Sequence, residues 1–196
     1  MGQRKGKMTN DDKRIAKIKQ MKIEKLIKEL LVIIGENPNR DGLLETPKRV
    51  AKFWNEFINY EPGKIETTFE AIKADQMVIV KNIKVWSLCE HHLMPFSSTV
   101  SIGYITRKKV LGLSKFARIA HKHAHKLQLQ EKLVQDIADE LGSLVGTKDI
   151  AVFAEGTHLC MVARGIKTDG QMITSVMQGA FRKEPETRQE FLSLVK

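Results

Sequence analysis

The chain has two cysteines, Cys89 and Cys160, and each lies close to histidines. Cys89 opens a Cys-Glu-His-His run that ends at His92, and Cys160 closes a His-Leu-Cys run that begins at His158. Cysteine and histidine are the side chains that bind zinc best, and one turn can close Cys-x-x-His on one metal. Cys89, His92 and Cys160 would supply three ligands and leave a fourth position for water, as in a catalytic zinc site. A fold that uses them must bring two distant segments together.

The residue pattern also suggests how these side chains divide their roles. A lone buried cysteine is usually a small hydrophobe, and a lone histidine is usually a core residue with a partner, so neither is a ligand by itself. In an extended backbone, side chains two apart share one side, which would place His158 beside Cys160. The adjacent His91 and His92 point differently in most conformations, so one can bind a metal while the other faces a substrate.

Charge and cysteine usage exclude several classes of protein. Two cysteines in 196 residues do not make a disulfide framework. No apolar run could span a bilayer, and no apolar segment follows the basic N-terminus, so we expect a cytoplasmic protein without membrane contact. The formal charge is +10, but residues 1–28 hold 10 of the 33 basic and 3 of the 23 acidic residues. A basic arm can bind polyanions, yet a solvated helix face is the commoner explanation, and we do not expect nucleic-acid binding.

The pattern divides the chain into three regions. These are a disordered basic arm (1–10), an N-terminal helical region (11–62) and a catalytic domain (63–196). In the second region, apolar residues at three- and four-residue steps predict a helix from Asp11 or Asp12 to Ile34. Thr46 as N-cap and Pro47 after it predict a second helix to about Tyr60, with a buried side. The residues expected on that side are Val50, Phe53, Trp54 and Phe57.

The third region has the pattern of an α+β domain. β-Branched residues predict strands, and amphipathic spacing predicts helices. The expected order is ββααββ with a final short helix: strands 77–86 and 98–105, helices 114–126 and 129–145, strands 150–154 and 172–181, and helix 185–194. The strand at 150–154 is expected to continue in some form towards Cys160 and Val162.

Further residues suit a nucleotide. Ser114 is a good N-cap, and Lys115 and Arg118 lie three apart in the first turn of its helix, where free N–H groups and cations suit a phosphate. Arg164 could aim at the same anion or could be a surface charge. Glu131 with neighbouring Gln130 could accept the paired N–H groups of a guanine edge, although a capping or surface role is equally natural. His121, His123 and His125 alternate along a helix, and we interpret them as surface or core residues, not as ligands.

Four longer runs in order, at 89–96, 112–119, 128–133 and 158–165, resemble the GTP cyclohydrolase I family, and so does the tail at 179–182 and 187–192. The resemblance covers roughly residue 37 to the C-terminus. It implies the tunnelling fold, in which antiparallel ββααββ sheets with two helices on one face, preceded here by N-terminal helices, close into a barrel across subunits. Departures are Lys132, where the family often has Arg, and Gly156-Thr157, where it often has Ala-Glu or Ala-Thr.

The resemblance also implies a reaction, the first step of pterin and folate-type biosynthesis. GTP is hydrolysed at C8, formate leaves, and the ribose is rearranged to give 7,8-dihydroneopterin triphosphate. It assigns Zn²⁺ to Cys89, His92 and Cys160, and proton transfer to His91 and His158. It assigns substrate binding to Ser114, Lys115, Arg118, Gln130, Glu131 and Arg164. It further implies a homo-oligomer, a decamer whose active sites lie between subunits.

Two other functions compete with this one. A related tunnelling-fold enzyme could act on a pterin or a deazapurine, but such relatives bind zinc with three histidines or use no zinc. A non-catalytic polyanion-binding protein could use the basic arm and the helix that begins near Ser114. That protein would need the Cys-His cluster to be structural or incidental.

Overall fold

The computed structural model describes residues 9–196, which form two compact units, one up to Asn59 and the other Tyr60–Lys196. Most of the arm predicted to be disordered, residues 1–8, lies outside the described residues. Along residues 9–196, no helix is both long and apolar enough to cross a membrane.

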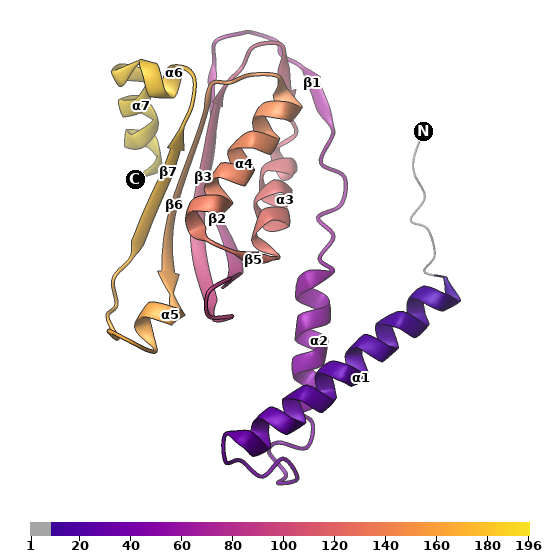
Figure 1. The fold of residues 1–196 in the computed structure, drawn as a ribbon. Coiled ribbons are helices and arrows are strands. Elements are labelled where there is room, and N and C mark those ends of the chain that lie inside the picture. The colour runs from indigo at the N-terminus through magenta and orange to yellow at the C-terminus, as the bar shows by residue number, and fades with distance from the viewer. Residues whose placement is uncertain (1–8) are drawn as a thin grey trace. The chain divides into compact units, whose positions relative to one another are not determined.

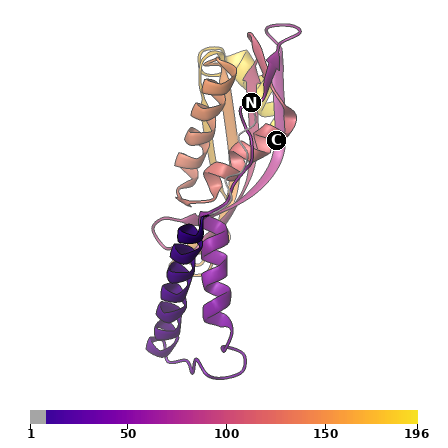
Figure 2. The same ribbon diagram turned by 90° about the vertical axis from the view of Figure 1, so that its right-hand side faces the viewer.

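The first unit consists of α1 (Asn10–Ile33) and α2 (Thr46–Ile58), which pack against each other (Figure 2). Thr9 and Asp12 form a capping box at the start of α1, which satisfies free N–H groups of its first turn. Thr46, the predicted N-cap of α2, lies inside the first turn instead, after an N-cap at Glu45 that makes no side-chain hydrogen bond. Phe57 is buried as predicted, whereas Phe53 is 44% exposed.

The second unit is built on a five-stranded sheet with the strand order β5-β2-β3-β6-β7 (Figure 1). Its strands are β2 (Met77–Cys89), β3 (Pro95–Ile105), β5 (Leu127–Gln128), β6 (Ile150–His158) and β7 (Met172–Met177). The four longer strands pair antiparallel, but β5 runs parallel to β2. The sheet is therefore mixed, whereas a wholly antiparallel sheet was expected. β1 (Thr68–Glu70) and β4 (Lys109–Leu111) form a separate two-stranded sheet.

Helices cover both faces of the five-stranded sheet. α3 (Leu113–Ala124) and α4 (Gln130–Val145) pack on the face that carries Val100 and Val152. α6 (Ala180–Lys183) and α7 (Pro185–Val195) pack on the other face, where Phe181 and Phe191 contact the cluster around Ala151. Neighbouring strand residues point to opposite faces, so Ala151 and Val152 join different clusters. The sheet is therefore buried on one face by α3 and α4 and partly covered on the other.

The last two strands end elsewhere than predicted, β6 beyond its expected end at Ala154 and β7 before its expected end at Phe181. β6 stops at His158, and the next residues form the short helix α5 (Leu159–Val162), so the extended backbone expected through Cys160 is wrong. β7 stops at Met177, because Gly179 has φ 56° and ψ −127° and turns the chain into α6. This left-handed conformation is adopted readily by glycine alone.

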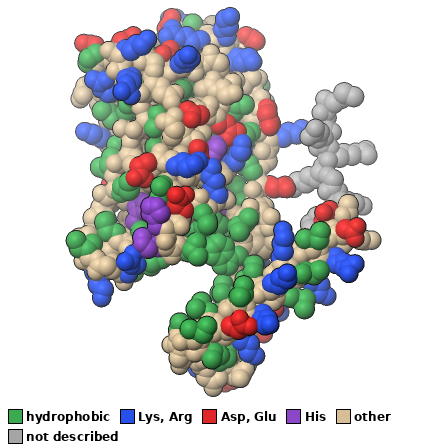
Figure 3. Space-filling view, viewed as in Figure 1, with side chains coloured by type: hydrophobic (Ala, Val, Ile, Leu, Met, Phe, Trp, Pro, Cys, Tyr) green, Lys and Arg blue, Asp and Glu red, His purple; other side chains and the backbone are tan. Residues whose placement is uncertain are grey.

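Charged side chains of both signs are interspersed over the face of the Tyr60–Lys196 unit that Figure 3 shows. This agrees with a charge excess that lies mostly in residues 1–28 of the sequence.

Candidate metal centre and active site

Cys89, His92 and Cys160 come together at one end of the five-stranded sheet. Their ligand atoms all lie within 4.8 Å of one another, and Cys89 Sγ is 3.6 Å from His92 Nδ1. Ligands bonded to one tetrahedral zinc at ordinary lengths are about 3.5 Å apart, so this donor set fits the ion. Within residues 9–196, no other group of three or more Cys, His, Asp or Glu side chains is close enough to hold a metal.

The loop between β2 and β3 is held in shape by its own backbone. The N–H of Cys89 donates to Met94 O at 2.8 Å, and the N–H of Leu93 donates to Cys89 O at 2.8 Å. Leu93 adopts φ 56°, which closes the turn tightly. The N–H of Glu90 donates to Gln128 O at 3.2 Å and so ties this loop to the segment before α4. The ligands are thus fixed against the residues that open α4.

Cys160 reaches the site from α5 and not from a strand. Burial raises the pKa of the Cys160 thiol, the Cys89 thiol beside it adds to this, and Arg164 opposes it. A metal binds the thiolate, so metal binding at this pair should release protons. His91 is exposed, and its ring stands at 85° to that of His92, with centroids 6.1 Å apart. The two adjacent histidines therefore point differently, as predicted.

His158 is held beside Cys160 by a ring stack and a hydrogen bond. It lies opposite Phe96 in the β3–β6 register, with ring centroids 4.5 Å apart and an interplanar angle of 4°. Its Nε2 is 2.9 Å from Gln130 Oε1. Burial lowers the pKa of His158 below 6.5, and Glu131 partly opposes that shift. The imidazole is therefore neutral near pH 7 and oriented in one plane.

Gln130 and Glu131 open α4 with very different surroundings. The Gln130 side chain is fully buried and bonded within the chain, so the surface role that seemed equally natural for it is wrong. Glu131 is exposed, and it lies near enough to His158 to act on its pKa. Arg164 is exposed just after α5. Glu131 and Arg164 thus flank the Cys-His group at the same end of the sheet.

The predicted phosphate residues lie at the far end of α3. The helix begins at Leu113 after Gly112 as N-cap, so Ser114 is not the N-cap but lies in the first turn with Lys115. Arg118, one turn later, donates to Lys64 O at 3.0 Å. Figure 1 shows α3 running from β4 towards β5, the strand that pairs with the end of β2 at Cys89. Twelve helical residues span about 18 Å, so this first turn is remote from Cys89 within one chain.

Sequence reasoning gave no role to several residues that complete the site. Phe96 and Ser98 lie on β3, Gly156 on β6 and Thr174 on β7, and all surround His158 or Gln130. Phe96 ends the run at 89–96 but was given no role there, and none of the runs contains the other three. Of these residues, only Gly156 stands out in the sequence, because the family often has Ala at its position. Their positions follow from strand register, which the sequence alone did not supply.

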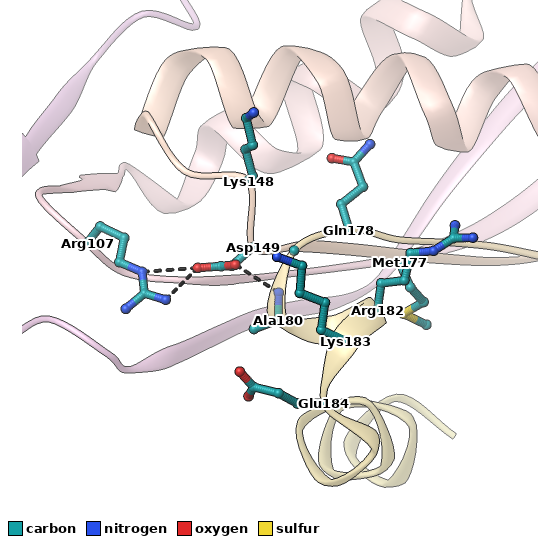
Figure 4. Close-up of a pocket in the computed structure, with 10 residues that line it drawn as sticks. Arg107, Lys148, Asp149, Met177, Gln178, Ala180, Arg182, Lys183 and Glu184 are labelled. Carbon is teal, nitrogen blue, oxygen red and sulfur yellow. Dashed lines mark hydrogen bonds and ion pairs between the residues drawn. The ribbon is translucent and has the colours of Figure 1, made fainter.

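A separate cavity of about 630 Å³ lies at the opposite end of the sheet (Figure 4). Its polar lining residues are Arg107, Lys148, Asp149, Gln178, Arg182, Lys183 and Glu184. Arg107 Nε donates to Asp149 Oδ2 at 3.0 Å, and the N–H of Ala180 donates to Asp149 Oδ1 at 2.8 Å. None of the predicted site residues lines this cavity.

Comparisons with known proteins agree with the residues at the site. The family model described as GTP cyclohydrolase I matches residues 23–196. The GTP cyclohydrolase 1 of Wolinella succinogenes is 42% identical over 95% of this chain and 99% of its own length. Those of Sulfurihydrogenibium sp. and Aquifex aeolicus are each 44% identical, over 91% of this chain and 96% and 98% of their own lengths.

Among solved structures, the archaeosine synthase QueF-Like in the apo form aligns with 53% of this chain and 95% of its own. Its TM-score of 0.40 and identity of 20% are too low to carry a conclusion. The match to the family model and the three relatives extends over nearly the whole chain and includes every residue of the Cys-His group. The chain therefore belongs to the GTP cyclohydrolase I family of enzymes.

Proposed function

We propose that this protein hydrolyses GTP at C8 and rearranges the product to 7,8-dihydroneopterin triphosphate, with release of formate. This would be the first step of pterin and folate-type biosynthesis. One observation carries the proposal: in a member of this family, two thiols and an imidazole converge within 4.8 Å beside a second, oriented imidazole, that of His158. Metal ligands next to an unligated acid–base group are what metal-assisted hydrolysis requires.

Zinc is the metal that suits this donor set. Two thiolates and one imidazole favour zinc over harder cations, and three protein ligands leave a position for water. Held by Cys89, His92 and Cys160, the ion would supply Lewis-acid activation of water for attack on C8. Its fit depends on deprotonation of both thiols, because a metal binds cysteine as thiolate.

The histidines of this chain would move the protons. His158 is kept neutral near pH 7 by burial, so it can accept a proton and later return it. His91 is exposed on the same loop as two of the ligands and would serve as the second acid–base group. Both roles need a ring that no metal occupies, which agrees with the perpendicular arrangement of His91 and His92.

The nucleotide would be held at both of its ends. The Glu131 carboxylate can accept the two parallel N–H bonds of a guanine edge, and it lies near His158. Arg164 would contact the triphosphate from the end of α5. Ser114, Lys115 and Arg118 would form the rest of the triphosphate clamp. Binding the phosphates would hold C8 in place for the reaction.

The position of this clamp supports a homo-oligomer. Since Ser114 and Lys115 lie about a helix length from Cys89 within one chain, a single copy does not assemble both halves of the site. A second copy would supply the clamp. We further propose the tunnelling fold with its ββααββ order and a decamer, on the strength of the family resemblance.

An assay with GTP tests the reaction. Purified zinc-loaded protein is incubated with GTP, and formate and the fluorescence of the oxidised neopterin product are followed. Both should appear in equal amounts. Metal-loaded, folded protein that yields neither product would refute the proposal, and binding of polyanions without turnover would favour the non-catalytic alternative.

Mixing two inactive variants tests where the clamp comes from. Lys115→Ala removes a clamp cation and Cys160→Ser removes a ligand, so each should be nearly inactive. Mixed oligomers formed by co-expression should regain part of the activity, because some sites then combine an intact clamp with an intact ligand set. Lys109→Ala, a change of an exposed cation on β4, serves as the control and should stay active. No recovery in verified mixed oligomers would place both halves of the site in one chain.

A further inference from the structure

The orientation of the Gln130 amide is decided by the end that faces away from His158. Its Nε2 lies 2.9 Å from Met172 O, 3.1 Å from Thr174 Oγ1 and 3.3 Å from Ala154 O. Backbone carbonyl oxygens only accept hydrogen bonds, so the NH₂ group must face them. A flipped amide would set its oxygen against two carbonyl oxygens in a buried site. Gln130 Oε1 therefore faces His158.

This orientation fixes the proton on one nitrogen of His158. Gln130 Oε1 is an acceptor, so His158 Nε2 at 2.9 Å must carry the hydrogen of that bond. Ser98 Oγ donates to the same oxygen at 3.2 Å. In a neutral imidazole only one nitrogen is protonated, so Nδ1 is left with its lone pair. Nδ1 is then the one nitrogen of His158 that can take up a proton.

Residue 156 is glycine, and the Gln130 amide lies directly against it. Gly156 stands opposite Ser98 on β3 and Met172 on β7 in the sheet register. A Cβ at this position would overlap Gln130 Oε1 and would lie 2.7 Å from Ser98 Oγ. It would also lie 2.9 Å from Ser97 O, a backbone atom that cannot move freely. The Gln130 amide thus occupies the volume that a side chain would fill.

We propose that Gln130, whose amide packs against Gly156, is a positioning residue for His158: it holds the ring with Nε2–H bonded to Gln130 Oε1, which leaves Nδ1 as the nitrogen with a free lone pair. Both ends of the amide are engaged inside the chain, so on this view Gln130 does not contact the guanine, and Glu131 does. The proposal rests on the proposed function only for the statement that His158 moves protons.

Steady-state kinetics on GTP separate positioning from substrate binding. Gln130→Met keeps the size of the side chain but removes its hydrogen bonds, and it should lower kcat by about 100-fold or more with KM changed by less than about threefold. Gln130→Glu keeps an acceptor for Nε2–H if its second oxygen, which faces Met172 O and Ala154 O, is protonated, and in that form it should recover part of the lost kcat. Gln135→Met, on the exposed side of α4, is the matched control and should behave as wild type. A raised KM with unchanged kcat would overturn the proposal in favour of a guanine contact.

Gly156→Ala tests the packing of the Gln130 amide against residue 156. It should lower kcat, but by less than Gln130→Met does, since the new methyl group shifts the amide while many family members have Ala at this position. In the double variant with Gln130→Ala, which empties that space, adding Gly156→Ala should cost little more than Gln130→Ala alone. Fully additive losses in kcat would show that Gly156 does not act through Gln130.

A spectroscopic measurement reads the proton position without turnover. Zinc-loaded, GTP-free protein labelled with ¹⁵N-histidine should show His158, assigned by its loss in His158→Asn, with Nε2 protonated and Nδ1 unprotonated. Gln130→Met should lose this single form, while Gln135→Met keeps it. A protonated Nδ1 in the neutral ring of wild type would overturn the proposal whatever the activity. Because no substrate is present, this outcome is independent of whether the enzyme forms dihydroneopterin triphosphate.

Discussion

At each end of the five-stranded sheet a polar side chain lies against a glycine, but the two ends differ in how completely that side chain's network is hydrogen-bonded. At one end the Gln130 amide lies over Gly156, and at the other the Asp149 carboxylate lies against Gly179, whose Cβ would overlap Oδ1. Both carboxylate oxygens of Asp149 accept hydrogen bonds, from Arg107, from Thr147 and from the N–H of Ala180. Among the described residues, Nδ1 of His158 makes no hydrogen bond. The polar network around Asp149, which we call the closed end, is fully hydrogen-bonded and stabilises the fold. The network around His158, the open end, leaves the Nδ1 atom without a partner in the described part of the chain.

The largest effect is expected at the open end, from loss of a metal ligand. Cys160→Ser should lower bound zinc from about one ion per chain to near zero and reduce formate production by about 1,000-fold or more. Metal content by mass spectrometry and the GTP assay measure both. Met161→Leu, the neighbouring apolar position, should change neither. Retained zinc together with full activity would refute the three-ligand site.

The next effect belongs to the closed end and should appear in stability. Gly179→Ala forces a side chain into φ 56°, ψ −127° and places Cβ 2.6 Å from Lys148 O, so we expect a loss of about 2–4 kcal/mol in unfolding free energy. Gly146→Ala is the control: φ is 70°, but nothing lies within 4 Å of its Cβ, and the expected cost is about 1 kcal/mol. Denaturant unfolding measures both, and kcat per folded molecule should be unchanged. Equal costs would show that the contact with Asp149 is unimportant.

A smaller, pH-dependent effect tests the charge at the closed end. Burial would raise the pKa of Asp149, but hydrogen bonds from Ala180 N–H and Arg107 outweigh this and hold it below 3.8. A lowered carboxyl pKa stabilises the folded state above the ordinary value, and that stability is lost as pH falls through the folded value. Asp149→Asn should therefore be less stable than wild type by about 1 kcal/mol at pH 7, since Arg107 is partly screened by solvent. The difference should shrink below about pH 4, and a difference that grew on acidification would contradict this assignment.

The smallest effect is expected from the N-terminal arm. Deleting residues 1–10 removes basic charge but no proposed ligand, proton donor or clamp residue. Turnover of GTP should stay within about twofold of wild type at physiological salt, where exposed charges are screened. A large loss in kcat or KM would show that the arm takes part in catalysis or substrate capture.

The sequence was most informative where the chemistry is local. The Cys-x-x-His spacing placed Cys89 and His92 on one loop, and the structure brings their ligand atoms to 3.6 Å. Amphipathic and β-branched patterns located the longer helices and strands, because those periods reflect one buried face. Short elements such as β1, β4 and α5 were not predicted, since three or four residues are too few to show a periodic pattern.

The residue types and their spacing thus predicted which side chains could hold a metal, and the family resemblance predicted a nucleotide substrate. Tertiary structure decided what surrounds them. Strand register set Phe96 opposite His158, and the docking of α4 carried Gln130 over Gly156. These contacts join residues from different strands and a helix. Their geometry depends on pairing and packing between segments, and no local pattern in the sequence records it.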